Sequence, residues 1–250
     1  MKIGIIGLGL IGGSIFKDLV KLGYDVIAVS NSQNGENIYK DYDVLKDCEV
    51  VFVCSAMNKT LSILDKLEEV LDENTIVTDV CSLKSFVCTK KRPYKLIPSH
   101  PMAGTEHKGF ENSFGGLFKN AKWVITPVYG NDEKLVKIIK ELGAKVVETT
   151  PEKHDEAVAL ISHMPMVIAQ AIFKTASENE LALEIASSGF RDMTRLAMSN
   201  TEMANDMVTM NADNIQTSIL KLYKSIGDLT NSNYLEQIED IKYNRQSMFL

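Results

Sequence analysis

The sequence lacks the features of a secreted, membrane-spanning or nucleic-acid-binding protein. Its 250 residues carry a net charge of −6, so no excess of basic side chains is available to meet phosphate backbones. It has no uninterrupted apolar run of the roughly 18 residues that a membrane span needs, and the N-terminus lacks the basic start of a signal peptide. We therefore expect a cytoplasmic protein with neither a nucleic-acid nor a membrane partner.

Cysteine is also scarce. The four cysteines stand at positions 48, 54, 81 and 88, and none of them forms a CxxC pair. No Cys or His grouping has the spacing of zinc ligands, so we predict no metal site. Cys54 and Cys81 fall at the ends of apolar runs, where a thiol acts as a small hydrophobic group. The rest of the composition, with 45% hydrophobic and 24% charged residues, is that of a globular protein of one or two domains.

The first 150 residues alternate short apolar runs with helical patterns. The runs are rich in β-branched residues and apolar on both faces, as buried parallel strands are. They cover residues 2–6, 25–29, 49–54, 75–79, 94–97, 123–126 and 145–148, and helical patterns cover residues 14–22, 59–71 and 133–142. This alternation predicts an α/β fold, a doubly wound Rossmann-type parallel sheet over residues 1–150. The polar segment 30–48 leaves room for a short helix at most, so we expect a trimmed sheet edge there.

The pattern changes at Pro151, which begins a helix with acidic residues in its first turn. The segment that follows, EAVALISHMPMVIAQAIFKTA, is apolar nearly all round, and the chain shows no strand pattern from there to Leu250. These features predict an all-helical domain over residues 151–250. Because it has more apolar faces than one copy can bury, we expect a homodimer that shares this domain's core.

The N-terminal segment KIGIIGLGLIGGS contains Gly7-x-Gly9-x-x-Gly12, directly after a strand and at the start of a helix. Gly7 allows a tight turn, Gly9 lets the backbone approach a pyrophosphate, and Gly12 lets helix and strand pack closely. The helix N-terminus offers free N–H groups to the phosphates. We predict a nicotinamide dinucleotide site made by Gly7, Leu8, Gly9, Leu10, Ile11 and Gly12, with Ser30, Asn31, Ser32, Cys54 and Ser55 from the next two strand ends.

The end of the second strand bears on the choice of cofactor. An NAD site has a carboxylate there, whereas this chain reads Val29-Ser30-Asn31-Ser32, and Asp25 lies at the wrong end of the strand. This strand end therefore has no carboxylate that would repel the 2′-phosphate of NADP. It also has no Arg or Lys between Ser30 and Gln33 that would attract that phosphate. The sequence therefore favours NADP and leaves NAD open.

Three further segments carry concentrated polar chemistry. TDVCSLKS (78–85) and SHPMAGTEHKGF (99–110) follow two strands, and GFRDMTRLA (189–197) lies in the helical part. Because ligands bind outside the carboxyl ends of strands in such sheets, we expect Ser82 and His100 near the nicotinamide.

With the glycine loop, these segments make the whole chain resemble the prephenate and arogenate dehydrogenases of tyrosine biosynthesis. The resemblance implies hydride transfer from a ring alcohol to NAD(P), accompanied by loss of the ring carboxylate as carbon dioxide. It implies that His100 takes the hydroxyl proton, with Ser82 bridging the histidine, the hydroxyl and the nicotinamide. Arg195 would hold a substrate carboxylate, and His163 and Thr105 would also contact substrate, in a crevice between the two domains. A neutral imidazole suits a general base, and a guanidinium suits a carboxylate.

Several of these residues have structural alternatives. Ser82 could cap a helix beginning near Leu83. Arg191 and Asp192 could simply pair with each other or with the partner subunit, and we expect His107 to be a solvated loop residue.

Three residues around the first long helix affect the interpretation. His154, in the helix's first turn beside Asp155, is predicted to be structural. Pro165 is expected to kink the helix just after His163. Met166 stands where many relatives have a second histidine, so recognition of the substrate's keto or ammonium group, in prephenate or arogenate respectively, stays open.

Two other functions compete with this hypothesis. One is a β-hydroxyacid dehydrogenase, whose helical-domain lysine normally lies in a glycine-rich motif. Lys174 stands instead in AIFKTASEN, without those glycines. The other is a nucleotide-binding sensor without catalysis, which need not retain Ser82, His100 and Arg195 together.

Overall fold

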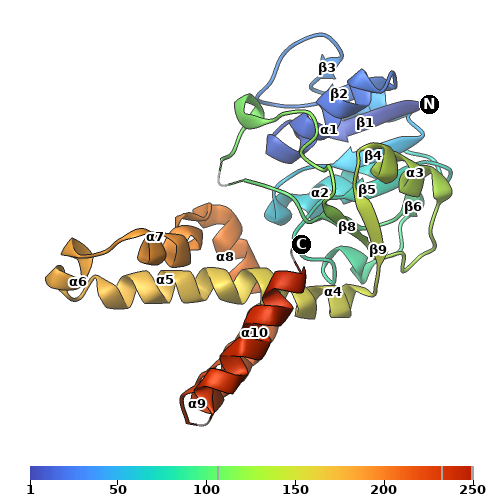
Figure 1. Ribbon diagram of the computed structural model, residues 1–250. Helices are drawn as coiled ribbons and strands as arrows, with labels where there is room; N and C mark the ends of the chain where they lie inside the picture. The colour runs from blue at the N-terminus through green and yellow to red at the C-terminus, as the bar shows by residue number, and fades with distance from the viewer. Residues whose placement is uncertain (106, 232, 249–250) are drawn as a thin grey trace.

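The computed structural model describes residues 1–105, 107–231 and 233–248 (Figure 1). The N-terminal part contains the strands, and the C-terminal part is helical and extends away from them in two arms. One arm holds α5, α6, α7 and α8, and the other holds α9 and α10 (Figure 1).

Six parallel strands form the main sheet, in the order β3-β2-β1-β4-β5-β6. They are β1 (Lys2–Ile6), β2 (Asp25–Val29), β3 (Ile38–Tyr39), β4 (Val50–Val53), β5 (Ile76–Asp79) and β6 (Lys95–Leu96). The order reverses between β1 and β4, so the carboxyl ends of these two strands form the crevice where ligands bind in such folds. The predicted α/β fold class, with a Rossmann-type sheet followed by helices, is confirmed.

A second sheet of three strands corrects part of the prediction. It consists of β7 (Ser99–Pro101), β8 (Lys122–Ile125) and β9 (Lys145–Glu148), with β7 antiparallel to β8. The runs at 123–126 and 145–148 therefore do not continue the parallel sheet, and β9 is mostly exposed rather than buried. The sequence did not reveal β7, because a three-residue strand with a proline has no readable periodicity.

The segment 30–48 forms a trimmed edge. It contains the two-residue strand β3 and one 3₁₀ turn, Tyr42–Leu45, in place of a crossover α-helix. The Ser30 N–H donates to the carbonyl of Tyr39, which ties this short edge to the end of β2.

Helices cover both faces of the main sheet. Alternate strand residues point to opposite faces, so Ile3 and Ile5 pack with α1 (Leu10–Lys21) and α3 (Glu133–Glu141), whereas Ile6 packs with α2 (Met57–Leu67). Two helices begin earlier than the apolar pattern suggested, α1 by four residues and α2 by two.

The helical part begins with α4 (Pro151–Val158), where Pro151 occupies the first turn and the Thr150 hydroxyl accepts the N–H of Lys153. One π-helical turn, Ala159–His163, joins it to α5 (Met164–Ala176). The widened turn therefore lies just before Pro165, where a kink is predicted. The remaining helices are α6 (Glu180–Glu184), α7 (Ser188–Thr194), the 3₁₀ turn Arg195–Met198, α8 (Thr201–Met210), α9 (Ala212–Asn231) and α10 (Tyr234–Met248).

Residues Pro151–Ala176 run on as one helix of 26 residues that could cross a membrane by length and composition, with a mean hydropathy of 1.5 in its apolar window. Polar residues such as His163 and Gln170 interrupt its apolar sequence, so it contains no long uninterrupted apolar run. Only 28% of that window is buried. The rest of the helical part also exposes large apolar side chains, among them Ile185, Met198, Leu220 and Leu235.

Candidate active site

The glycine loop forms a cradle that side chains would fill. Gly7 has φ +90°, and a Cβ on it would lie 2.6 Å from the carbonyl oxygen of Cys54. A Cβ on Gly12 would lie 2.0 Å from the carbonyl oxygen of Gly7, so helix and turn meet only through glycine. Gly9 caps α1 with no side-chain hydrogen bond, and open space surrounds its Cβ position. The cradle fits the pyrophosphate of a dinucleotide.

The other residues predicted for this site line the same loop. Leu8 is buried in the core, and Leu10 and Ile11 are half-buried in the first turn of α1. Cys54 packs beneath Gly12, where burial raises the pKa of its thiol far above the ordinary value. Its neighbour Ser55 exchanges a hydrogen bond with the hydroxyl of Thr60, at 2.9 Å.

The loop after β2 is organised by a lysine that the sequence interpretation missed. The ammonium of Lys40 donates to the carbonyls of Ser30 at 2.8 Å, Asn31 at 3.3 Å and Gln33 at 2.8 Å. The Ser30 hydroxyl accepts the N–H of Gln33, while Asn31 and Ser32 are exposed. Lys40 therefore brings to this loop the positive charge that its own sequence lacks. The feature that could have indicated this role is the position of Lys40 directly after β3, because β3 pairs with β2.

His100 lies within the short strand β7, where residues 99–101 pair with β8 and set His100 opposite Val124. Its Nδ1 atom lies 3.0 Å from Nε2 of His154, which is 2% exposed. The sequence interpretation took His154 as structural, but the structure places it directly against the candidate base.

Asp155 supports His154 from the same helix. Its carboxylate accepts from His154 Nδ1 at 2.8 Å and from the backbone N–H groups of Lys84 and Ser85 at 2.8 and 2.9 Å. Burial opposes its ionisation, but the hydrogen bonds from His154, Ser85 and Lys84 outweigh that effect and hold the pKa of Asp155 below its ordinary value. The carboxylate of Asp155 therefore joins α4 to the loop that follows β5.

A buried ion pair lies beneath His100. The Lys84 side chain is fully buried, and its ammonium donates to the Asp79 carboxylate and, at 2.6 Å, to the carbonyl of Ser99. Desolvation of the His100 ring, the charge of Lys84, and the nearby imidazoles of His154 and His163 hold the pKa of His100 well below 6.5. The ring is thus neutral at neutral pH, as a proton acceptor must be.

Ser82 lies half-buried in the loop after β5, between Asp79 and Lys84. No helix begins at Leu83 in this described segment, and the nearest helical turn is the 3₁₀ turn Val87–Thr89. The alternative that Ser82 caps a helix is therefore wrong.

His163 lies in the π turn and is 1% exposed. Its Nδ1 atom is 3.2 Å from the amide nitrogen of Asn211, which also donates to the carbonyl of Asp155, while the Asn211 amide oxygen accepts from Asn214. An amide nitrogen only donates, so Nδ1 of His163 accepts and Nε2 carries the hydrogen. Within the described residues this Nε2 has no hydrogen-bond partner. Burial, chiefly, lowers the pKa of His163 to about 4.

An apolar cluster joins the two parts of the chain beside these residues. It includes Cys81 and Leu83, which flank Ser82, together with Ala204 and Met207 of α8 and Val158 and Met166 of the long helix. Met102 and Leu196 pack against it. The segments that carry Ser82, His100 and Arg195 therefore meet at this junction.

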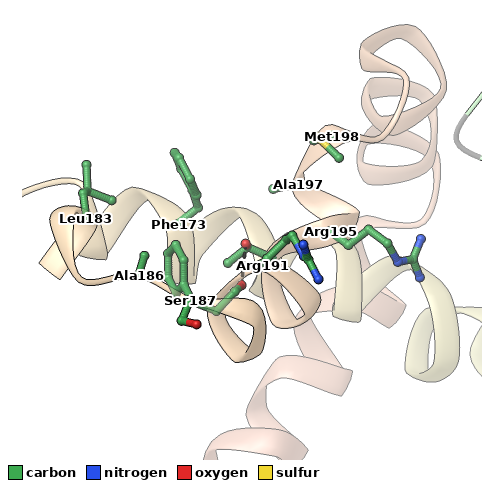
Figure 2. A pocket seen from close by; sticks show the side chains of 10 residues that line it. Phe173, Leu183, Ala186, Ser187, Arg191, Arg195, Ala197 and Met198 are labelled. Atoms are coloured by element: carbon green, nitrogen blue, oxygen red, sulfur yellow. Dashed lines mark hydrogen bonds between the residues drawn. The ribbon is translucent and has the colours of Figure 1, made fainter.

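Arg195 lies on a pocket that His100 does not line. Arg195 is exposed and lines a pocket of about 510 Å³ within the helical part, where Phe173 and Phe190 stack at 5.9 Å. Figure 2 shows its side chain extending away from Phe173 and Leu183. Arg191, on the same pocket, pairs with Asp192 at 3.7 Å.

Thr105 is also exposed, and its hydroxyl accepts the N–H of His107 at 3.2 Å. The structure therefore brings together the glycine loop residues and, separately, His100, His154, Asp155 and Lys84. Among the described residues, neither Thr105 nor Arg195 forms a hydrogen bond or an ion pair with either group.

Family patterns match most of the chain. Residues 26–148 match the pattern described as prephenate dehydrogenase, nucleotide-binding domain, and residues 150–242 match prephenate dehydrogenase, dimerization domain. A prephenate dehydrogenase of Bacillus subtilis is 30% identical over an alignment of 236 positions, and the match covers 84% of this chain and 64% of that protein. The chain spans slightly less than two thirds of the length of two such curated relatives, 64% and 65%.

Solved structures of similar proteins cover nearly the whole chain. An arogenate dehydrogenase from Synechocystis is 32% identical with a TM-score of 0.81, and the match covers 99% of this chain and 97% of that one. A prephenate dehydrogenase from Aquifex aeolicus, solved with hydroxyphenyl propionate and NAD+, is 26% identical with a TM-score of 0.85 and coverages of 99% and 98%.

Proposed function

Because the chain belongs to the prephenate dehydrogenase family, we propose that it is an NAD(P)-dependent dehydrogenase that oxidises and decarboxylates prephenate or arogenate. The observation that carries this proposal is a neutral imidazole, His100, held by buried charges beside the carboxyl edge of a sheet whose first turn is a glycine cradle. We also propose the division into a dinucleotide-binding domain, residues 1–150, and a helical domain, residues 151–250. The end of β9 and the start of α4 support it.

The cradle of Gly7, Gly9 and Gly12 would hold the nicotinamide cofactor, which when bound supplies a hydride acceptor. His100 accepts the proton of the ring hydroxyl at the nitrogen that does not face His154, while the carbon bearing that hydroxyl loses its hydrogen as hydride. The bond to the ring carboxylate then breaks and carbon dioxide leaves. Its electron pair enters the ring and reaches the ring oxygen, which takes the proton back from His100 and becomes the hydroxyl of a phenol. Because aromatisation drives the reaction, the chain's main tasks are positioning and polarisation.

Four side chains would position the substrate. Ser82 would hydrogen-bond between His100 and the ring hydroxyl, and Arg195 would bind a substrate carboxylate with its planar fork. His163 would donate its unpaired Nε2 hydrogen to a substrate oxygen, and Thr105 would close the site from the loop after β7. These roles require Arg195 to approach His100 across the junction between the domains, and Thr105 to approach it from the loop after β7.

The test of this function is the ultraviolet absorbance of reduced cofactor, with prephenate and arogenate each supplied with NAD and with NADP. We expect reduction in at least one of the four mixtures. The absence of reduction in all four would refute the dehydrogenase proposal.

Of the two cofactors we propose NADP as the preferred one. The loop after β2 has no carboxylate to repel a 2′-phosphate, Asn31 and Ser32 are exposed there, and Lys40 adds a positive charge beneath its carbonyls. The Aquifex aeolicus relative was solved with NAD+, so both cofactors are compared in the test.

Replacing Lys40 with methionine should lower the ratio of kcat/KM for NADP to that for NAD by about five- to tenfold, since one partly solvated charge is removed. Lys46→Met removes another exposed charge, just after the nearby 3₁₀ turn, and serves as the control. Steady-state kinetics with both cofactors give the two ratios. An equal loss of both activities in Lys40→Met would mean that Lys40 only orders the loop.

The helical domain would form a homodimer. Its exposed apolar side chains, such as Ile161 and Ile185 at 66% and 70% exposure, need a partner surface, and the family pattern over residues 150–242 is that of a dimerization domain. Burial of these faces in a dimer would also keep the long apolar helix out of lipid, in a cytoplasmic enzyme. Sedimentation should give about twice the chain mass of 27.8 kDa, and a monomer mass would contradict the dimer.

A further inference from the structure

A chain of hydrogen bonds leads from His100 to a buried carboxylate on α4. His100 Nδ1 lies 3.0 Å from His154 Nε2, and His154 Nδ1 lies 2.8 Å from an oxygen of Asp155. His154 and Asp155 are only 2% and 4% exposed, so water does not compete for these bonds. His100, His154 and Asp155 are therefore linked by hydrogen bonds in a fixed sequence, with His154 in the middle.

The end of this chain determines which nitrogen carries each hydrogen. An ionised carboxylate only accepts, so His154 Nδ1 must be the donor to Asp155. A neutral His154 then has a lone pair on Nε2, and His100 must donate to it from Nδ1. The lone pair of His100 consequently lies on Nε2, the ring nitrogen that faces away from His154.

From this geometry we infer that His154 and Asp155 are positioning residues, which fix His100 in the tautomer whose Nε2 accepts the substrate proton. The inference rests on the proposed function, because His100 acts as a base only in that reaction, but the tautomer itself does not depend on it. When His100 takes the proton at Nε2, the hydrogens already on Nδ1 of His100 and Nδ1 of His154 stay where they are. The ring becomes an imidazolium whose Nδ1–H bond to His154 strengthens, and the negative charge of Asp155 stabilises it.

The carboxylate at the end of the chain is itself firmly placed. Two backbone N–H groups, of Lys84 and Ser85, hold Asp155, and the Lys84 ammonium donates to the carbonyl of Ser99, next to His100. The hydrogen bonds to Asp155 also keep its pKa below the ordinary value, which preserves the charge on which the order of donors depends. Lys84 thus connects both ends of the network.

Nitrogen NMR of the histidine rings tests the tautomer directly, because protonated and unprotonated ring nitrogens have distinct shifts. In protein labelled with ¹⁵N-histidine, His100 should carry its hydrogen on Nδ1, and its signals are identified by their loss in His100→Asn. His163 is the internal control, since the amide of Asn211 imposes the opposite tautomer, with the hydrogen on Nε2. A hydrogen on Nε2 of His100 in the wild-type protein would overturn the inference.

Two variants of His154 separate positioning from packing. His154→Phe fills the same space without an acceptor, and should lower kcat about 10- to 100-fold while the substrate KM and the cofactor Kd change by less than about twofold. His154→Gln keeps an acceptor for His100 and a donor for Asp155, and should restore most of kcat. Full activity of His154→Phe would overturn the inference. If the wild-type protein has no dehydrogenase activity but His100 shows the Nδ1 hydrogen, the proposed function fails and the tautomer stands.

Discussion

Replacing His100 with asparagine should lower kcat by about 10²- to 10⁴-fold, because a positioned general base contributes an acceleration of that order. Asparagine keeps a hydrogen-bonding side chain near His154 but cannot accept a proton at neutral pH. The glycine cradle and the Lys40 loop lie on other segments, so the cofactor Kd should stay within about twofold of the wild-type value. Steady-state kinetics and equilibrium cofactor titration measure the two effects.

His107→Asn is the matched control, because it makes the same change at an exposed position in the same segment. Its kcat should match that of the wild-type protein. If His100→Asn and His107→Asn retain equal activity, His100 is not the base.

The pH profile of the wild-type protein should agree with a depressed pKa at His100. The base must be neutral to act, so kcat/KM falls only when the pH drops below the pKa of His100 in the free enzyme. Because desolvation, Lys84, His154 and His163 hold that pKa well below 6.5, activity should stay level as the pH falls through 6.5 and decline only in more acidic solution. A decline centred at or above 6.5 would show that His100 is not shielded as described.

Replacing Arg195 with alanine should raise the substrate KM about 30- to 100-fold, or ~2 to 3 kcal/mol, with a smaller change in kcat. A guanidinium that holds a spectator carboxylate binds ground state and transition state alike, so its loss appears mainly in KM. Arg195→Lys should recover only part of the affinity, since a point charge cannot form the paired hydrogen bonds of the planar fork.

Arg191→Ala is the control for this prediction, because Arg191 lines the same pocket but already pairs with Asp192. Its KM should stay within about threefold of the wild-type value. A larger effect at Arg191 than at Arg195 would show that the other arginine binds the carboxylate.

The features that could be predicted from the sequence are local. The spacing of Gly7, Gly9 and Gly12 reports backbone constraints within one turn, and the apolar runs of β1, β2 and β9 match the structure residue for residue. The helix start at Pro151 is equally local, because proline and a capping threonine act within one turn. Such local features can be interpreted from the sequence without knowing which segments pack against them.

The features that escaped prediction depend on contacts between distant segments. His154 lies 54 residues from His100 in the chain, and only the packing of α4 beside β7 brings the two rings together. Lys40 reaches the loop at Ser30 only because a two-residue strand pairs beside β2, and such a strand carries no periodicity to read. The role of Lys84 beneath His100 likewise required the fold, since a lysine in sequence indicates a solvated side chain.

The most direct measurement of the central claim is the stoichiometry of one reaction. The purified protein is given prephenate or arogenate with the preferred cofactor, and released carbon dioxide, reduced cofactor and phenolic product are quantified together. Oxidative decarboxylation predicts one molecule of each per turnover, with all three nearly abolished in His100→Asn. Cofactor reduction without matching carbon dioxide, or undiminished turnover in His100→Asn, would contradict the account.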